Sequence, residues 1–384
     1  MGIMKDGVIK KAKEIFDFKN EIIVGYSPGR VNLIGEHLDY NGGYVLPCTL
    51  DIGTYGAVCG REDNRVYCFS DNFPEKGPVM FTLNKLIYQA EDEWANYVKG
   101  MVKELNPPFG FDLYVKGNIP PGAGLSSSAS LEILIGLIIN QLYQLNYSRI
   151  DLVKMAQKVE NVFIGVKSGI MDQFVIGMIE KKAAMLLNTA NLDYKCINVD
   201  FQNYTLVIGN TNKRRTLQSS KYNERREECN DGFSILRKKY HIDYLCQLKT
   251  KNFNESIDLF SDDIIRNRVR HVITENERTL EAFQALKAKN IQLFGKLLNE
   301  SHCSLRDDYE VTGLELDTMV SLFQKFGAIG ARMTGAGFGG CMIALVPNEL
   351  ISEITVKVES EYTKSLGLTP EFYIVNIGNG AKIL

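Results

Sequence analysis

Several features that this 384-residue sequence lacks exclude whole classes of protein. It has eight cysteines but no C-x-x-C pair, so a zinc site or a redox dithiol has no support from spacing. Scattered cysteines in a chain of this length indicate free thiols in a reducing cytoplasm. Basic residues are not in excess, with 44 Lys and Arg against 46 Asp and Glu. This balance argues against a nucleic-acid partner or an acidic membrane surface.

Long apolar runs are also missing. The most apolar stretch, residues 131–145, contains Glu132, Asn140 and Gln141. It is too short and too polar to span a bilayer, so a buried helix is the better interpretation. The first residues have no apolar signal core, and apolar side chains at helical spacing in residues 9–16 predict a short amphipathic helix. We therefore expect a cytoplasmic protein.

The remaining sequence predicts both strands and helices. The chain is long for one core, so we expect two domains, residues 1–185 and residues 186–384. Runs rich in β-branched and aromatic residues predict strands at 22–25, 44–46, 54–58, 65–69, 111–115, 183–187, 205–209, 340–346 and 371–377. Apolar residues at helical spacing predict helices around 94–101, from 129 onward, and at 152–163, 219–240, 267–289 and 314–326.

Residues 120–130, with the sequence PPGAGLSSSAS, form the most informative local segment. Glycines let the backbone approach a phosphate, serines supply hydroxyl groups, and the following helix offers free N–H groups at its N-terminus. The spacing is neither that of a Walker A loop nor that of a Rossmann turn. A glycine-rich turn that caps a helix is the alternative explanation. The candidate nucleotide-binding residues here are Gly122, Ala123, Gly124, Leu125, Ser126, Ser127 and Ser128.

Three segments together resemble the motifs of the GHMP kinases, the family of galacto-, homoserine, mevalonate and phosphomevalonate kinases. They are residues 29–37 (GRVNLIGEH), 120–130 and 333–341 (MTGAGFGGC). Residues 38–43 (LDYNGG) and 169–173 (GIMDQ) narrow the resemblance to the galactokinases. The resemblance implies a two-lobed α+β fold with the active site in the cleft between the lobes. It also implies phosphorylation of the anomeric hydroxyl of D-galactose, with ATP as co-substrate and Mg²⁺ as cofactor.

The resemblance gives roles to single residues. Asp172 would face the C1 hydroxyl and accept its proton late in a loose phosphoryl transfer. Arg30 would hold Asp172 ionised and offset charge on the transferring group. Without the family context, Asp172 is more simply a helix cap and Arg30 a surface residue. The implied sugar contacts are Glu36, His37, Asp39, Gly169 and Tyr222.

The resemblance also implies a metal site and an adenine site. Ser128 and Glu160 would offer a hydroxyl and a carboxylate to Mg²⁺, which prefers oxygen ligands and is shared with substrate phosphates. Trp94 and Tyr97, three residues apart on one helix face, would lie near the adenine base, although core packing explains them nearly as well. The expected partners are the small molecules galactose and ATP, without nucleic acid or membrane, for a monomer or weak homodimer.

One departure from the galactokinase pattern leaves the substrate open. Galactokinases usually have threonine where this chain has Leu38. A related sugar-1-kinase acting on N-acetylgalactosamine, L-arabinose or galacturonate is one alternative. A non-catalytic galactose sensor is another, although the full serine run at 126–130, with Asp172 and Arg30, favours an active enzyme.

Overall fold

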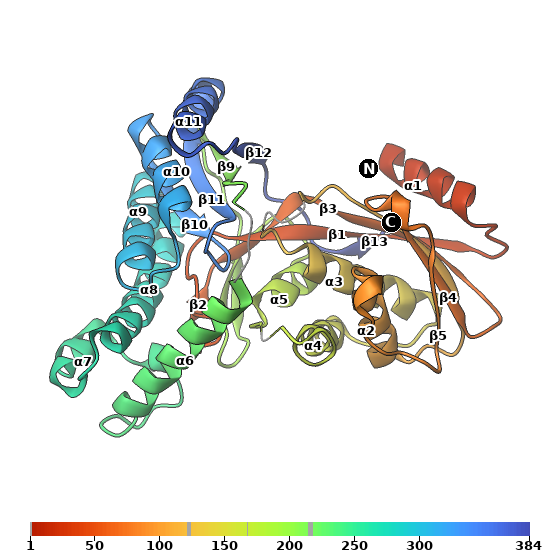
Figure 1. Ribbon diagram of the computed structural model, residues 1–384, viewed down its shortest axis with the longest axis horizontal. Coiled ribbons are helices and arrows are strands. Elements are labelled where there is room, and N and C mark those ends of the chain that lie inside the picture. The colour runs from red at the N-terminus through yellow and green to blue at the C-terminus, as the bar shows by residue number, and fades with distance from the viewer. Residues whose placement is uncertain (1, 121–123, 167, 214–217) are drawn as a thin grey trace.

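The computed structural model describes residues 2–120, 124–166, 168–213 and 218–384. Within these ranges the strands form one sheet of nine strands and a second sheet of four, and helices pack on both (Figure 1). The expected α+β class is therefore confirmed.

The larger sheet is built mostly from the first half of the chain. Its strands are β1 (Ile22–Asn32), β2 (Tyr44–Val45), β3 (Pro47–Gly60), β4 (Arg65–Ser70), β5 (Val79–Thr82), β6 (Phe111–Gly117), β7 (Ala184–Asn188), β8 (Tyr194–Ile197) and β13 (Lys382–Ile383). The main path runs β13-β1-β3-β6-β4-β5, and β7 joins it through β2 and β3. The pairing of β4 with β6 is parallel, and the other pairings described for this sheet are antiparallel.

Helices cover both faces of this sheet. The helix α1 (Gly2–Ile15) lies on one face, and the opposite face carries α2 (Ala95–Leu105), α3 (Ser127–Leu142), α4 (Arg149–Lys158) and α5 (Met171–Met178) (Figure 1). A Cβ on Gly25 of β1 would lie only 2.5 Å from Ile138 Cγ2 of α3. Glycine at this position therefore lets α3 approach the sheet closely.

The smaller sheet belongs to the second half of the chain. Its strands are β9 (Tyr204–Asn210), β10 (Gly330–Thr334), β11 (Cys341–Pro347) and β12 (Glu371–Val375), all antiparallel in the order β10-β11-β9-β12. The α-helices of this half are α6 (Gln218–Leu236), α7 (Thr250–Asn254), α8 (Asp263–Lys287), α9 (Ile291–Asp307), α10 (Leu314–Lys325) and α11 (Ile351–Leu366). Short 3₁₀ turns lie at Pro74–Lys76, Ala90–Asp92, Leu245–Gln247, Ile257–Leu259 and Asn348–Leu350.

The predicted elements agree with this fold more closely in the first half than in the second. Every predicted strand overlaps an observed one, and the predicted helix at 152–163 is α4 followed by a π-helical turn, Val159–Ile164. The helices α9 and α11 are absent from the sequence-based prediction. The expected domain boundary near residue 185 lies within β7, and strand pairing places the change of sheet between β8 and β9.

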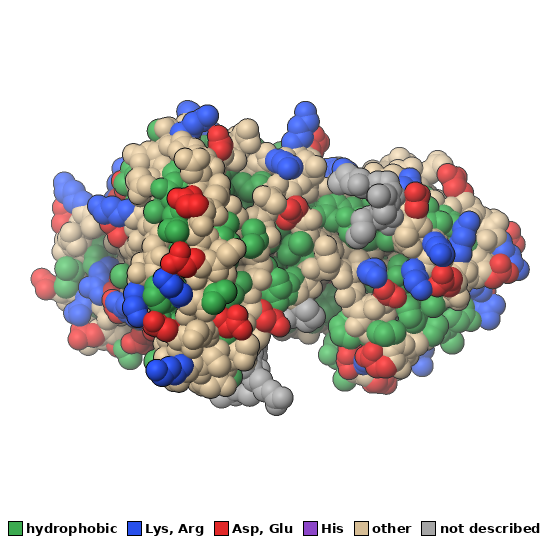
Figure 2. Space-filling view, turned by 90° about the horizontal axis from the view of Figure 1, so that it is seen from above, with side chains coloured by type: hydrophobic (Ala, Val, Ile, Leu, Met, Phe, Trp, Pro, Cys, Tyr) green, Lys and Arg blue, Asp and Glu red, His purple; other side chains and the backbone are tan. Residues whose placement is uncertain are grey.

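The distribution of surface charge and the state of the cysteines agree with the interpretation of the composition. None of the described helices is long and apolar enough to cross a membrane. Acidic and basic side chains are interspersed over the face seen from above, and the molecule is hollowed between its two lobes (Figure 2). All eight cysteines are free.

Candidate active site

One cleft collects almost all of the residues predicted for the site. Its volume is about 650 Å³, and both halves of the chain contribute to its walls. The predicted residues that line it are Arg30, Glu36, His37, Asp39, Tyr97, Gly124, Leu125, Ser126, Ser127, Ser128, Glu160, Gly169, Asp172 and Tyr222. Gly122 and Ala123 lie outside the described residues, and Trp94 packs against the main core. Clefts of this kind are the usual location of small-molecule sites.

Asp172 and Arg30 form a charged pair in this cleft. Arg30 Nε donates to Asp172 Oδ1 and Arg30 Nη2 donates to Asp172 Oδ2, both at 2.6 Å. Arg30 Nη1 donates to the carbonyl oxygen of Gly124 at 2.8 Å, and Ser126 Oγ donates to Asp172 Oδ2 at 2.5 Å. Two parallel bonds from one guanidinium group fix the orientation of the carboxylate. The Asp172 side chain is 29% exposed against 7% for Arg30, so Asp172 is the more accessible member of the pair.

The strand β1 brings Arg30 to the cleft just after an irregularity in its pairing with β3. Pro28 pairs with Gly53 and Arg30 pairs with Thr49, so residues 50–52 of β3 lie opposite the single residue Gly29 of β1. Extra residues of this kind in one strand often occur next to active sites. The backbone N–H of Arg30 donates to the carbonyl oxygen of Leu125 at 3.2 Å, which joins this strand to the loop before α3.

The N-terminus of α3 opens into the same cleft. The cap residue Ser126 has a left-handed conformation, with φ 60°, and the helix begins at Ser127. The N–H groups of a first helical turn have no partner within the helix and favour an anion. The Leu125 side chain is 1% exposed in a hydrophobic core, so this residue can contribute only its backbone to the loop.

Glu160 lies in the π-helical turn and receives two serine hydroxyls. Ser128 Oγ donates to Glu160 Oε1 at 2.6 Å, and Ser168 Oγ donates to Glu160 Oε2 at 2.7 Å. π-Helical turns inside α-helices often occur at functional sites. The described residues contain no group of three or more His, Cys, Asp or Glu that could hold a metal by themselves. A hydroxyl and a carboxylate still fit Mg²⁺, because this ion keeps several waters and binds substrate phosphates.

Glu36 is held in one orientation in the wall of the cleft. Its side chain accepts hydrogen bonds from Asn32 Nδ2 at 3.1 Å, Thr334 Oγ1 at 3.0 Å and the N–H of Gly335 at 2.8 Å. Arg332 Nη2 lies 3.4 Å from Glu36 Oε1. These contacts tie the loop after β1 to the end of β10 and fix the carboxylate in one orientation.

Asp39 lies against Gly169 with no space between them. A Cβ on Gly169 would be 1.7 Å from Asp39 Oδ2, so only glycine allows this approach. Burial, and then the nearby charges of Asp172 and Glu36, raise the pKa of Asp39 to about 7. Asp39 therefore changes charge near neutral pH.

His37 is surrounded by tyrosines. Its ring centroid lies 4.8 Å from that of Tyr309, 5.7 Å from that of Tyr222 and 6.0 Å from that of Tyr40. Burial, reinforced by the charges of His271 and Arg332, lowers the pKa of His37 to about 3. The imidazole is thus neutral at physiological pH, and one of its nitrogens must be an acceptor.

The sequence prediction gave no role to three residues of this site. They are Ser168 beside Glu160, Thr334 on Glu36 and Tyr309 against His37. Ser168 lies next to the motif segment 169–173 and Thr334 lies within the segment 333–341, which is the signal that could have identified these two residues. Their partners come from distant parts of the chain, so the contacts themselves cannot be read from spacing.

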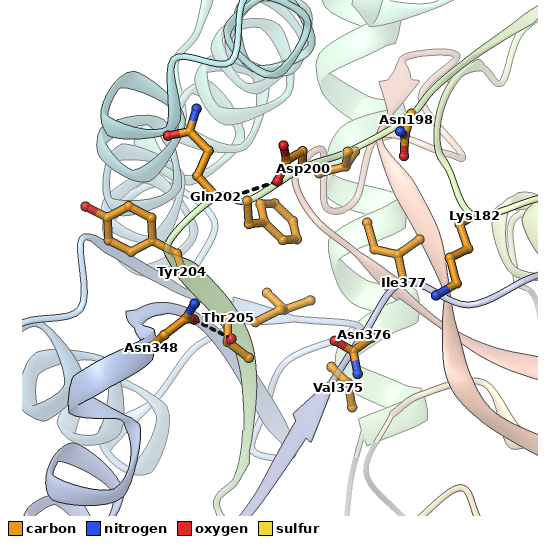
Figure 3. A pocket seen from close by; sticks show the side chains of 13 residues that line it. Lys182, Asn198, Asp200, Gln202, Tyr204, Thr205, Asn348, Val375, Asn376 and Ile377 are labelled. Atoms are coloured by element: carbon orange, nitrogen blue, oxygen red, sulfur yellow. Dashed lines mark hydrogen bonds between the residues drawn. The ribbon is translucent and has the colours of Figure 1, made fainter.

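A second hollow, of about 370 Å³, lies between β9 and the segments that connect the two sheets (Figure 3). Its labelled side chains are mainly amides, hydroxyls and aliphatic groups, with Lys182 and Asp200 as the charged groups. Lys182 and Asp200 come from different segments, and no hydrogen bond or ion pair joins them in the described structure. The first cleft is therefore the better candidate for chemistry.

Comparison with known families agrees with this geometry. The chain matches the family described as GHMP kinases N terminal domain over residues 96–179 and GHMP kinases C terminal over residues 282–364. The Galactokinase galactose-binding signature matches residues 13–59. These matches include the segments that carry Arg30, Glu36, Ser128 and Asp172.

Relatives along the whole chain are similar too. A galactokinase of Clostridium acetobutylicum is 50% identical over 379 residues, which cover 97% of each chain. A galactokinase of Staphylococcus saprophyticus is 48% identical over 381 residues, 98% of each chain. The crystal structure of Lactococcus lactis galactokinase complexed with galactose is similar, with a TM-score of 0.95, 45% identity and 99% of each chain covered. Methanococcus jannaschii mevalonate kinase shares the fold, with a TM-score of 0.65 at 21% identity over 94% of this chain and 99% of that chain.

Proposed function

This chain belongs to the galactokinase family of the GHMP kinases, and on that premise we propose that it transfers the γ-phosphoryl group of ATP to the C1 hydroxyl of D-galactose. The products are galactose 1-phosphate and ADP. The observation that carries this proposal is the Arg30–Asp172 pair, which joins the phosphate loop at Gly124 to the sugar end of the cleft.

Asp172 acts on the sugar hydroxyl. A carboxylate is a much weaker base than a sugar alkoxide, so it orients the C1 hydroxyl first and accepts its proton late. A loose phosphoryl-transfer transition state needs little activation of the nucleophile. Arg30 orients the carboxylate of Asp172, and its positive charge offsets the negative charge on the transferring group.

The other end of the cleft recognises the sugar. Glu36, His37 and Asp39 supply two carboxylates and an imidazole within four positions of the sequence, and Tyr222 adds a hydroxyl. A sugar whose hydroxyl groups match these partners leaves none of them unpaired. An epimer would leave buried polar groups without partners, which costs about 1–3 kcal/mol each.

The nucleotide end binds phosphate and Mg²⁺. The N-terminus of α3, with Ser127 and Ser128, accommodates the phosphates, and Tyr97 lies further along the same cleft. Ser128 and Glu160 would hold Mg²⁺, which supplies positive charge to the ATP phosphates when bound. Ser168 orients Glu160 through its second carboxylate oxygen.

Leu38 does not reach the sugar. Its side chain is 0% exposed, belongs to the main hydrophobic core and is absent from the cleft wall. A Cβ on Gly43 would lie 2.9 Å from Leu38 Cβ, which shows how tightly this turn packs. The threonine that galactokinases usually have here is therefore replaced without loss of a cleft hydroxyl, which supports galactose as the substrate. A cytoplasmic monomer or weak homodimer is part of the same proposal.

A sugar panel tests this proposal. Purified protein with ATP and Mg²⁺ is given galactose, glucose, talose, 2-deoxygalactose, galactosamine, N-acetylgalactosamine, L-arabinose or galacturonate, and ADP release is followed. We expect strong turnover on galactose and none on glucose. Preference for another sugar would contradict galactose as the substrate but would still agree with the proposed phosphoryl transfer. Binding of galactose and ATP by calorimetry without turnover would instead support a sensor.

A further inference from the structure

Behind the sugar end of the cleft, four side chains from three segments of the chain form a buried chain of hydrogen bonds. Nδ1 of His37 lies 2.8 Å from the hydroxyl of Tyr40, and that hydroxyl lies 2.8 Å from the hydroxyl of Tyr309. The Sγ atom of Cys229 lies 3.0 Å from the Tyr309 hydroxyl. His37 and Tyr40 follow β1, Tyr309 follows α9 and Cys229 belongs to α6.

The second ring nitrogen of His37, Nε2, lies at the end of this series of hydrogen bonds. Nε2 is buried and has no hydrogen-bond partner, although His37 lines the cleft. A buried polar atom without a partner is costly, so a partner from outside the protein is expected. Whether Nε2 is a donor or an acceptor depends on which nitrogen carries the single proton of the neutral ring.

We propose that Tyr309 and Tyr40 form a one-way hydrogen-bond relay that holds His37 with its proton on Nε2, so that His37 offers a hydrogen-bond donor to an oxygen of the sugar. The inference rests on the proposed function for its ligand. Tyr40 and Tyr309 are positioning residues, because they act through His37 and not on the sugar itself.

Acid–base strength sets the direction of the relay. A phenol hydroxyl is the stronger acid and an imidazole nitrogen the stronger base, so the Tyr40 proton belongs on the bond to Nδ1. Tyr40 oxygen then accepts from the Tyr309 hydroxyl, and the Tyr309 oxygen can accept from the thiol of Cys229. Bonds that all run one way polarise and strengthen one another.

Single substitutions can remove hydrogen bonds of the relay while the backbone and the rings stay in place. Arg225 Nε donates to the backbone carbonyl of Tyr309 at 2.9 Å, so the position of Tyr309 does not depend on its hydroxyl. Tyr40→Phe removes the donor to Nδ1 and keeps the ring. Cys229→Ala removes a group that the proposed direction does not require. Tyr362→Phe is the matched control, because its buried hydroxyl donates to the carbonyl of Thr211 at 3.1 Å, outside the relay.

The direct test is a long-range ¹H–¹⁵N NMR spectrum of the four histidines, with His37 assigned by comparison with His37→Gln. We expect His37 to carry its proton on Nε2 in the parent protein and in Cys229→Ala and Tyr362→Phe. In Tyr40→Phe the second tautomer should appear. The KM for galactose should rise roughly tenfold in this variant alone, while kcat and the KM for ATP stay within about threefold.

Two results would overturn the relay. One is a proton on Nδ1 in the parent protein, and the other is a Tyr40→Phe variant with an unchanged tautomer and galactose KM. A rise in galactose KM in Cys229→Ala would reverse the direction of the bonds and also contradict the proposal. The spectra need no turnover, so failure of the relay is distinguishable from failure of galactose as the substrate.

Discussion

Asp172 illustrates how much of the site depends on one side chain. Its carboxylate receives three hydrogen bonds, two from Arg30 and one from Ser126, and still stays partly exposed. Asp172→Asn keeps the size and loses the charge and the proton acceptor. We expect kcat to fall by roughly 10²- to 10⁴-fold, with galactose binding by calorimetry nearly unchanged.

A second aspartate paired with an arginine provides the control for this variant. Asp112 receives two bonds from Arg61 Nη1, at 3.0 Å and 3.2 Å, on a strand that does not line the cleft. Asp112→Asn should keep nearly full turnover. Equal losses in the two variants would show that Asp172 matters for folding and not for chemistry.

Asp39 makes sugar binding depend on pH. Because burial raises its pKa to about 7 from an ordinary value of 3.8, the native state holds this proton more tightly than the unfolded state. The contribution of Asp39 to the free energy of unfolding should therefore decrease as pH rises from about 4 to about 7. The carboxylate is the better acceptor for sugar hydroxyls, so galactose affinity should increase over the upper part of this range.

Two measurements check the two expected pH trends, calorimetry for galactose binding and thermal unfolding for stability. We expect the Kd for galactose to fall between about pH 6 and about pH 8 in the parent protein, with a weaker trend in Asp39→Asn. Thermal unfolding of the ligand-free proteins should show the opposite trend with pH, again weaker in the variant. A Kd with the same pH dependence in both proteins would assign the titration to another group.

The loop after β1 contacts the loop before α5, and a single glycine, Gly169, makes this contact possible. Because a Cβ on Gly169 would lie 1.7 Å from Asp39 Oδ2, Gly169→Ala must displace Asp39 or the start of α5. We expect kcat/KM for galactose to fall at least roughly tenfold. Gly165→Ala tests the alternative of a general backbone effect, because nothing lies within 4 Å of its Cβ position although its φ of 89° is strained.

The π-helical turn and α3 together carry the proposed metal site. If Ser128 and Glu160 bind Mg²⁺, Glu160→Gln should raise the Mg²⁺ concentration needed for half-maximal rate roughly 10- to 100-fold. Glu104→Gln, which removes a surface carboxylate paired with Lys158, should leave it unchanged. The titration of activity with Mg²⁺ is the measurement, and identical curves for the two variants would remove Glu160 from the site.

The sequence predicts elements best where the apolar pattern is local. The strands β1, β3 and β6 and the helix α3 contain short apolar runs, and the prediction identifies each of them over part of its length. The helix α9 is missing from the prediction although its sequence carries local signals: the cap Asn290 accepts from the N–H of Leu293, and the buried residues Ile291, Phe294 and Leu298 have helical spacing. The strand β13 has only two residues and exists because it pairs with β1, which no local pattern can indicate.

The sequence predicts more of the candidate site than of the fold, because the site residues lie in recognisable motifs. Residues such as Arg30, Glu36 and Asp172 lie in short motifs, and the structure brings them to one cleft. The bonds between them cross more than 140 residues of sequence, as between Arg30 and Asp172, or nearly 300, as between Glu36 and Thr334. Tertiary packing determines such contacts, so the network that orients each residue requires the structure.

At the scale of the whole molecule, both halves of the chain line the same cleft. Residues of β1, α3 and α5 form one side of the cleft, and Tyr222, Gly335 and Ala336 come from the other half. Ligands that bind only the folded state stabilise it, by about 2.7 kcal/mol at a hundred times Kd. We therefore expect galactose to raise the melting temperature of Asp172→Asn as much as that of the parent protein.

That melting experiment separates binding from catalysis. A shift with galactose and none with glucose would agree with the proposed recognition by Glu36, His37 and Asp39. Equal shifts with both sugars would contradict it, because a cleft that pairs each hydroxyl must distinguish an axial from an equatorial one.

The most direct test of the account follows the reaction at the sugar itself. Galactose labelled with ¹³C at C1 is incubated with ATP, Mg²⁺ and either the parent protein or Asp172→Asn, and the C1 signal is recorded over time. We predict that the parent protein gives a C1 signal coupled to phosphorus, and that the variant gives almost none in the same period. Phosphate on another carbon, or equal rates in the two proteins, would contradict the assignment of Asp172 and Arg30 to phosphoryl transfer at C1.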